Sequence, residues 1–362
     1  MKIRKSVVWN NETLIIRKYN HERDEANVLQ LWRAAFNNQM PPSLWQWKYI
    51  ENPYRTAIMI CENSKSLPVV FYGGVPFAST CCGRQIVMIH LSDIMSHPDY
   101  RGSGLFIHTA NAYFDTFGSV DDICIMYGFP GKFHFDIGAK YLQYSPLGSG
   151  AAFFKAESEN IKKFKQIVSG TIALFPASDP CFDYIWKNLS TIYPLSVVRD
   201  SAYMAWRYFK HPVRKYEVWC YKGLFHKEWQ AFVVIQIKDE VVTIESEAIS
   251  KQDGITQTND KTNFRRTAQK AVIVDMLMPD SEPVFRDFMG SVASMLIKRG
   301  IKTVETWISD NHFLCSLFSK YGFEKAEEPI GIIPTVRLFE NTFDINWVNQ
   351  NFYYTMGDGD LF

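Results

Sequence analysis

The chain has 362 residues, of which 47% are hydrophobic and 21% charged, values typical of a globular protein with a substantial core. Its formal net charge of +1 leaves no basic excess to neutralise a phosphate backbone, so we expect no nucleic-acid partner. No apolar run approaches the roughly 18 residues that span a bilayer, and the N-terminus lacks the apolar core of a signal peptide. We therefore expect no membrane partner and a cytoplasmic location.

Cysteine and histidine usage argues against disulfide and metal chemistry. The seven cysteines are scattered without a C-x-x-C pair, and the eight histidines show no H-E-x-x-H spacing. We predict reduced, mostly buried thiols and no metal site.

The predicted elements of the first half run from strands to helices. Runs rich in Val, Ile and aromatic residues predict strands at 56–61, 69–77 and 86–95. Residues 105–117 read as a helix and 123–127 as a strand. A short helix at 132–137 is expected to end at Gly138.

The second half repeats this order. Strands are predicted at 216–221, 231–237, 241–246 and 271–278, and a strand at 303–308 follows the helix at 283–299. A short helix at 311–321 closes at Gly322. The polar segment 251–270 is expected to be a mobile loop, and the aromatic residues of 342–362 predict a docked tail.

A tryptophan motif links the two halves. The motif W-[KR]-Y-x-x-[NH]-P occurs at residues 47–53 and again at 206–212, and 206 − 47 = 159 residues is close to one domain. Trp45, Trp47 and Tyr49 are read as core residues. The motif and the shared element order favour a duplication over chance likeness. We predict an α/β fold with mixed sheets, in two domains at 1–165 and 166–345, with a tail at 346–362.

The stretch Ile94–Phe106 is the most informative for function. An apolar strand passes through S-H-P-D-Y and R-G-S-G-L into a helix. Such a turn directs backbone N–H groups and the positive end of a helix at one point, which suits a pyrophosphate. Gly102 and Gly104 leave room for close approach of a ligand. Neither of the common nucleotide-binding glycine motifs is present.

This stretch resembles the coenzyme A motif [QR]-x-x-G-x-[GA] of the GNAT superfamily of N-acetyltransferases. Arg101 and Gly104 fit the motif, whereas Phe106 replaces the usual small residue. W-x-W-K-Y-x-x-N-P at 45–53 and Y-G-F-P at 127–130 resemble a subgroup with tandem domains. The resemblance implies acetyl-CoA as donor, bound by the residues of the turn: Met95, Ser96, Arg101, Gly102, Ser103, Gly104, Leu105 and Phe106. In the second half, acids and prolines at 278–283 replace the glycines, so no coenzyme is expected there.

Three residues are candidates for acid–base chemistry. Asp93, within an apolar strand before the turn, is the first choice for general base. The alternative is a structural role, which is strengthened because Asp275 holds the similar place in the second half. His97 is the second choice. By the family's placement of a Tyr four residues before the closing glycine, His134 is the candidate general acid, with Tyr127 and Tyr141 as nearby alternatives.

The resulting prediction is an enzyme that transfers an acetyl or other acyl group from acetyl-CoA to a small-molecule primary amine, as a monomer or homodimer. An aminoacyl transferase resembling the peptidoglycan cross-bridge enzymes and a non-catalytic binding protein with the same fold remain alternatives. The acceptor and the acyl chain length are left open.

Overall fold

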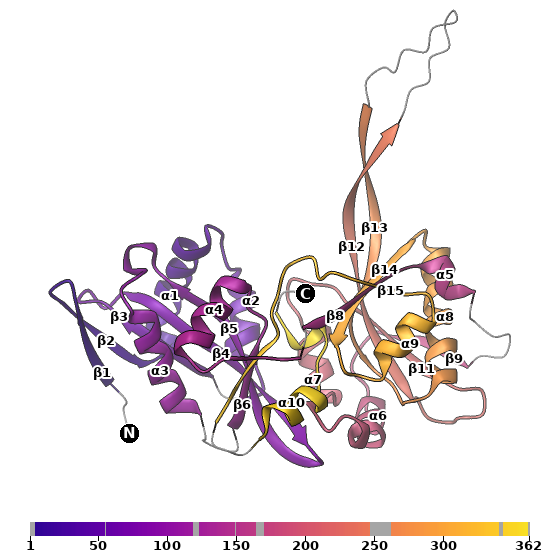
Figure 1. Cartoon of the computed structure of the whole chain (residues 1–362), viewed down its shortest axis with the longest axis horizontal. Coiled ribbons are helices and arrows are strands. Elements are labelled where there is room, and N and C mark those ends of the chain that lie inside the picture. The colour runs from indigo at the N-terminus through magenta and orange to yellow at the C-terminus, as the bar shows by residue number, and fades with distance from the viewer. Residues whose placement is uncertain are drawn as a thin grey trace, which may run out of the picture.

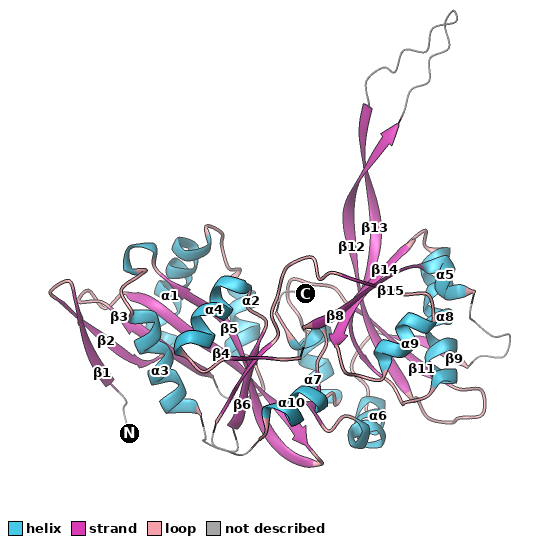
Figure 2. Cartoon of the chain, viewed as in Figure 1, coloured by secondary structure: helices cyan, strands magenta, loops and turns pink. Residues whose placement is uncertain are grey.

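The computed structural model describes residues 4–54, 56–118, 123–148, 150–163, 170–246, 262–339 and 343–360. They form two mixed β-sheets that lie side by side, with helices on their faces (Figure 1). Figure 2 shows strands and helices mixed in both halves, as the prediction of a mixed α/β fold requires. No helix in the described part of the chain is long and apolar enough to cross a membrane.

The first sheet has the strand order β1-β2-β3-β4-β5-β6-β16-β7, with one short strand beside β4 and a second short strand beside that one. Its strands are β1 (Arg4–Trp9), β2 (Glu12–Lys18), β3 (Ala57–Glu62), β4 (Pro68–Cys81), β5 (Arg84–Ser96), β6 (Ile123–Gly128), β7 (Ser145–Pro146), β10 (Leu195–Val197), β16 (Thr335–Leu338) and β17 (Phe352–Tyr353). Its helices are α1 (His21–Phe36), α2 (Pro42–Trp45), the π-helical turn η1 (Gln46–Ile50), the 3-10 turn η2 (Pro98–Tyr100), α3 (Leu105–Phe117) and α4 (Lys132–Tyr141).

The second sheet has the order β15-β8-β14-β13-β12-β11-β9. Its strands are β8 (Ala151–Glu157), β9 (Thr171–Phe175), β11 (Glu217–Lys222), β12 (Ala231–Ser246), β13 (Thr262–Leu277), β14 (Thr303–Ser309) and β15 (Glu324–Ala326). Its helices are α5 (Ser158–Lys162), α6 (Cys181–Leu189), η3 (Ser190–Ile192), α7 (Ser201–Met204), the π-helical turn η4 (Ala205–Phe209), α8 (Glu282–Lys298), α9 (Leu314–Lys320), α10 (Ile345–Asn351) and η6 (Met356–Asp358).

The two long predicted helices are confirmed as α3 and α8. Helix α3 buries the face that carries Leu105, Thr109, Ala112, Tyr113 and Thr116, at the spacing of an amphipathic helix. It begins directly after Gly104 and ends at Gly118.

The expected end of α4 at Gly138 is wrong, because α4 continues to Tyr141. Gly138 lies inside the helix, where a Cβ atom would fall 2.0 Å from the ring of Tyr144. The glycine is therefore needed for close packing rather than for ending the helix.

The predicted mobile loop at 251–270 needs a correction. Residues 262–270 belong to β13, which pairs with β12 from Phe232↔Leu277 out to Ser246↔Thr262. The predicted strands at 231–237 and 241–246 are one continuous strand, and the hairpin extends away from the body of the molecule (Figure 1). The sequence of residues 262–270 is polar and lacks the apolar alternation by which a strand is recognised, so the strand was not predicted. Residues 247–261 lie outside the described part of the chain.

Sheet membership does not follow the predicted boundary at residue 165. Strand β8 from before it pairs with β14 in the second sheet, whereas β16 pairs with β6 in the first. Each half of the chain thus contributes one strand to the sheet of the other half. The domain limits 1–165 and 166–345 stay a prediction.

The predicted docking of the C-terminal tail is confirmed. Phe352, Tyr353 and Tyr354 are buried, and the described chain ends at Asp360 between the two halves (Figure 1). The tail therefore contributes to the space between the sheets.

Strands β5 and β6 part within the first sheet. They pair in parallel from Val87↔Ile123 to His90↔Tyr127, but β5 continues to Ser96 without β6. A register shift opposite Phe71–Gly73 marks a bulge, and Asp93 there has a left-handed φ of 56°. Bulges redirect side chains and commonly stand beside functional sites. This gap positions the candidate site.

Candidate functional site

The predicted phosphate-binding turn lies between β5 and α3. After η2, the chain turns through Gly102 and Gly104, whose φ values of 75° and 76° are left-handed. A Cβ atom on either glycine would meet no atom within 4 Å, so the space above both residues is open. Glycine is required here for the backbone conformation and leaves the turn open to a ligand.

Most amides of this turn are available. Among the described residues, no hydrogen-bond acceptor is found for the N–H groups of Gly102, Ser103, Gly104 and Phe106. The other two expected donors are used internally, because the Arg101 amide donates to the Pro98 carbonyl (3.2 Å) and the Leu105 amide to Ser103 Oγ (3.3 Å). Exposed amides at the start of a 13-residue helix are well suited to an anion.

A groove of about 960 Å³ opens at this turn, between α3, α4 and the end of α1. Seven of the eight residues predicted to bind the coenzyme line it: Met95, Ser96, Arg101, Gly102, Ser103, Gly104 and Phe106. Leu105 does not, because its side chain is fully buried in the core on the inner face of α3. The Arg101 guanidinium is tied to α1, since Nη2 donates to the Ala35 carbonyl at 3.1 Å.

Phe106, the departure from the motif, does not close the groove. Its ring packs 5.8 Å from the ring of Tyr72 and lines both this groove and the next cavity. It therefore forms part of the wall between them.

The second cavity, of about 320 Å³, lies where β5 and β6 part. It is lined by residues 90–94 of β5 and by Met126 and residues 128–131 at the end of β6. Phe36, Ile94, Phe106 and His134 line both cavities, so the groove leads into this space.

Two carboxylates share one lysine at the wall of this second cavity. Lys48 Nζ lies 2.7 Å from Asp93 Oδ2 and 2.6 Å from Asp360 Oδ2. The Lys48 side chain is only 6% exposed. Two carboxylates against one buried ammonium leave a net negative charge, which favours a cation in the cavity.

Asp93 reaches the cavity but is closed in by protein groups. Its Oδ2 also accepts a hydrogen bond from the Tyr49 hydroxyl at 2.8 Å, and its side chain is 7% exposed. Burial raises the pKa of Asp93, against the opposing effect of Lys48. The second half has the same arrangement, since the Tyr208 hydroxyl donates to Asp275 Oδ2 at 2.7 Å. This parallel favours a structural role for Asp93.

Asp360 and His90, which the sequence did not single out, face the cavity. Asp360 is 30% exposed and accepts a hydrogen bond from Ser92 Oγ. Burial alone would raise the pKa of Asp360, but Lys48 and His90 hold it below its usual value. Burial lowers the pKa of His90 to about 4, so its imidazole is neutral at pH 7. The second cavity is thus lined by an anionic acceptor, the Asp360 carboxylate, and by a neutral one, the His90 imidazole.

The other two acid–base candidates lie differently. His97 lines neither cavity, and its Nδ1 instead accepts a hydrogen bond from the Asp99 amide at 3.3 Å. His134 lines both cavities. Burial and the nearby Arg101 lower the pKa of His134, which disfavours the imidazolium that a proton donor needs. Tyr127 is buried, and its hydroxyl donates a hydrogen bond to the Asp358 carbonyl. Tyr141 lines the groove at the glycine turn.

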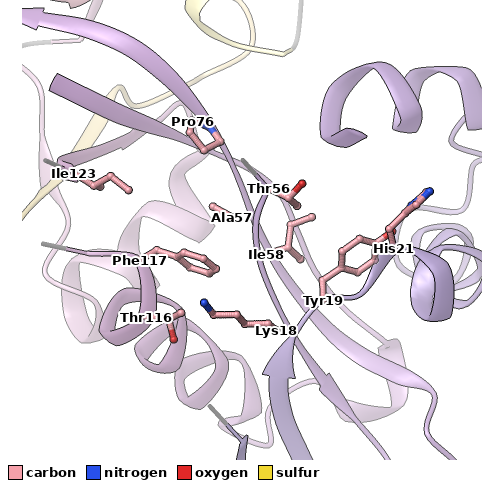
Figure 3. Close-up of a pocket in the computed structure, with 10 residues that line it drawn as sticks. All are labelled: Lys18, Tyr19, His21, Thr56, Ala57, Ile58, Pro76, Thr116, Phe117 and Ile123. Carbon is pink, nitrogen blue, oxygen red and sulfur yellow. The ribbon is translucent and has the colours of Figure 1, made fainter. Parts of the chain in front are cut away.

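A third hollow, of about 250 Å³, lies at the opposite end of α3 and has no comparable groups. Figure 3 shows its lining, in which the Lys18 ammonium lies near the ring of Phe117, 5.1 Å from the centroid. Its lining has neither a glycine turn nor an acidic pair, so it suits neither a pyrophosphate nor an ammonium. No cluster of three or more His, Cys, Asp or Glu side chains suited to a metal occurs within the described ranges.

The equivalent gap in the second half is occupied by the chain itself. Strand β13 pairs with β14 only over Lys270–Val272 and then continues without β14, while it stays paired with β12. Beyond this point the Ser309 amide donates to the Tyr354 carbonyl, and Thr355 Oγ1 donates to Asp275 Oδ1 at 2.9 Å. The tail thus fills the position that corresponds to the cavity, which agrees with the loss of the glycine turn from this half.

Comparisons with known proteins agree with this geometry. Residues 16–138 match the family model of the acetyltransferase (GNAT) domain. No curated protein matches the chain.

Solved structures share the fold of nearly the whole chain. A probable N-acyltransferase of unknown function from Enterococcus faecalis is 13% identical, with a TM-score of 0.63 over 91% of this chain and 73% of that one. A GCN5-related N-acetyltransferase from Anabaena variabilis is 12% identical, with a TM-score of 0.61 over 93% and 74%. N-myristoyltransferase from Saccharomyces cerevisiae, solved with myristoyl-CoA, is 7% identical, with a TM-score of 0.55 over 92% and 84%. Residues 16–138 thus match a GNAT acetyltransferase domain, and the chain as a whole shares its fold with these solved structures.

Proposed function

We propose that this protein is an N-acyltransferase that moves an acyl group from an acyl-CoA, with acetyl-CoA as the simplest donor, to a primary amine. The supporting observation is the set of unpartnered amides at Gly102, Ser103, Gly104 and Phe106, at the mouth of a groove that leads to the Asp93–Lys48–Asp360 cluster. The turn supplies an anion site for the pyrophosphate, and the cluster supplies negative charge where an ammonium must arrive.

The reaction has defined requirements. The amine nitrogen forms a C–N bond with the thioester carbonyl carbon, the C–S bond breaks, and an ammonium substrate releases protons, one of which the thiolate can take. The carbonyl oxygen needs hydrogen-bond donors as charge develops on it. We propose the backbone amides around Ile94–Ser96, beside the bulge in β5, for this role.

We propose Asp360, which the sequence did not single out, as the carboxylate that contacts the acceptor amine, whereas Asp93 was predicted as the general base. It is the more exposed of the two carboxylates, at 30% against 7%, and it faces the cavity together with neutral His90. An ammonium bound there would neutralise the net charge of the cluster, and His90 could receive a proton as the amine attacks. His134 stays a proposal for the proton donor to the thiolate.

The direct test is an acyl-transfer assay with purified protein. Acetyl-CoA is incubated with a panel of primary amines that spans amino sugars, amino acids and polyamines. Thiol release is followed with a chromogenic disulfide, and mass spectrometry identifies the acylated amine. We expect thiol release in proportion to acylated amine for at least one class. Coenzyme binding without any transfer would favour a binding protein, and transfer from charged tRNA alone would favour an aminoacyl transferase.

A further inference from the structure

Arg337 forms part of the wall of the cavity between β5 and β6. It lies on β16, opposite Met126 of β6, and its guanidinium carbon is 4.0 Å from the ring centroid of Phe114 on α3. Nη1 donates to the Leu142 carbonyl. The side chain therefore lies on the α3 side of the first sheet, across the sheet from Lys48.

This guanidinium has no ion-pair partner among the described residues, although the Asp115 carboxylate acts on its pKa from a greater distance. None of the described carboxylates lies within ion-pair distance, and Nε is shielded from solvent without a hydrogen-bond partner. Burial lowers the pKa of Arg337, but an arginine remains protonated in proteins. The aromatic faces of Phe114 and Phe339 offset only part of the desolvation, because a cation–π contact contributes less than a buried unpaired charge costs.

The fully buried Arg199 offers a comparison, because its guanidinium is paired with two carboxylates. Its Nε lies 2.9 Å from Asp275 Oδ1 and its Nη2 lies 2.6 Å from Asp358 Oδ2. Arg337 has no such partners on the Nε–Nη2 edge, which is the edge that binds a carboxylate through two parallel hydrogen bonds. A ligand in the adjoining cavity is well placed to supply that carboxylate, because Arg337 lines the cavity.

The cavity has two distinct sides. Asp360 and His90 lie on one side, where the amine is proposed to bind, while Phe106, Tyr144 and Arg337 close the α3 side. A thioester held at the bulge between them would direct its acyl group toward the α3 side, because the amine must approach from the other. The wall is otherwise apolar there, and the Tyr144 hydroxyl is bonded to the hydroxyl of Tyr72.

We propose that the preferred acyl group carries a carboxylate at its far end, which Arg337 binds, so that the physiological donor is the CoA thioester of a short dicarboxylic acid. This inference rests on the proposed function and changes no bond of the transfer. The aromatic stacking keeps the guanidinium in the cavity wall, and the acyl carboxylate supplies the missing negative charge.

The test compares donors that differ only in the terminal group. The ratio of kcat/KM for succinyl-CoA to that for butyryl-CoA is measured with one amine and the wild-type chain. We expect a ratio of about ten or more, from one charged hydrogen-bonded pair in a low-dielectric site. Arg337→Met should reduce this ratio about tenfold, and Arg337→Lys should give an intermediate value because lysine keeps the charge without the planar fork.

Arg299→Met is the matched control. Arg299 is exposed and paired with Glu217 on the second sheet, far from the cavity, so its loss should leave the ratio unchanged. A wild-type ratio near one overturns the inference even if the Arg337 variants fail to fold. Equal losses for both donors in Arg337→Met would also overturn it. Absence of turnover with every acyl-CoA would instead refute the proposed function itself.

Discussion

The indoles of Trp47 and Trp206 stack 4.6 Å apart, only 8° from parallel, and each binds the other's backbone. Trp47 Nε1 donates to the Trp206 carbonyl at 2.8 Å, and Trp206 Nε1 donates to the Trp47 carbonyl at 3.0 Å. The two copies of the repeated motif therefore meet in a reciprocal, pseudo-twofold contact.

The residues beside these tryptophans also correspond. Both motif copies form π-helical turns, η1 and η4, which are rare structures. Tyr49 and Tyr208 each donate to an aspartate on the central strand of their own half. These matching contacts are what a duplication predicts, and they place the two halves against each other through equivalent residues.

Replacement of Trp206 by phenylalanine should weaken the contact between the halves. The Trp47 carbonyl would lose its donor, and the smaller ring would leave a gap in a site that is 6% exposed. We expect a loss of roughly 1–3 kcal/mol in the free energy of unfolding, measured by urea denaturation. Trp32→Phe is the control, because the Trp32 indole bonds to Asn38 at the surface, and it should lose less than about 0.5 kcal/mol.

Asp360 and Asp93 should differ in what their removal affects. Asp360→Asn removes the exposed carboxylate of the cluster, so we expect kcat/KM for the amine to fall by about 10²-fold with little change in the thermal midpoint. Asp93→Asn changes an enclosed carboxylate that contacts Lys48 and Tyr49. We therefore expect it to lower the thermal midpoint by more than Asp360→Asn does, and to lower kcat/KM by less. An inactive but fully stable Asp93→Asn variant, beside an active Asp360→Asn variant, would reverse the assignment.

Acid should destabilise the protein through buried neutral histidines. Burial lowers the pKa of His312 to about 3, whereas an unfolded histidine titrates near 6.5. Unfolding therefore takes up a proton below pH 6.5, and stability falls as the pH falls from 6.5 toward 3. His90, with a pKa of about 4, acts in the same direction.

Calorimetric unfolding between pH 7 and 5 measures this effect. In His312→Phe the decline in the free energy of unfolding should be smaller than in the wild type by roughly 1–2 kcal/mol. The change in slope is the informative quantity, because the substitution can also shift the stability at pH 7. An unchanged slope would show that His312 is protonated in the folded state.

Local patterns were sufficient for several parts of this structure. The glycine turn combines a strand, a conformational requirement at Gly102 and Gly104, and a helix within adjacent residues, so the sequence predicts it directly. Helices α3 and α8 follow from apolar spacing in the same way. The long ribbon of β12 and β13 was missed in part because its outer residues carry no apolar alternation.

Other parts depend on contacts between distant residues. Lys48 and Asp360 are 312 positions apart, so no local pattern joins them. Lys48, the charged residue within the tryptophan motif, was the signal available in the sequence. A cation in a buried aromatic turn requires an acidic partner nearby. Arg337 gave no comparable signal, since its place beside β6 results from the exchange of strands between the halves.

Isothermal titration calorimetry with coenzyme A tests the central claim most directly. Gly104→Glu is compared with Gly300→Glu, because both glycines have a φ of 76° and open space around the added side chain, and Gly300 lies after α8 in the second half. Both variants should carry similar backbone strain, about 1 kcal/mol. The account predicts micromolar-range binding by the wild type and by Gly300→Glu, with at least tenfold weaker binding by Gly104→Glu. No binding by the wild type, or equal binding by both variants, would contradict a pyrophosphate site at residues 102–106.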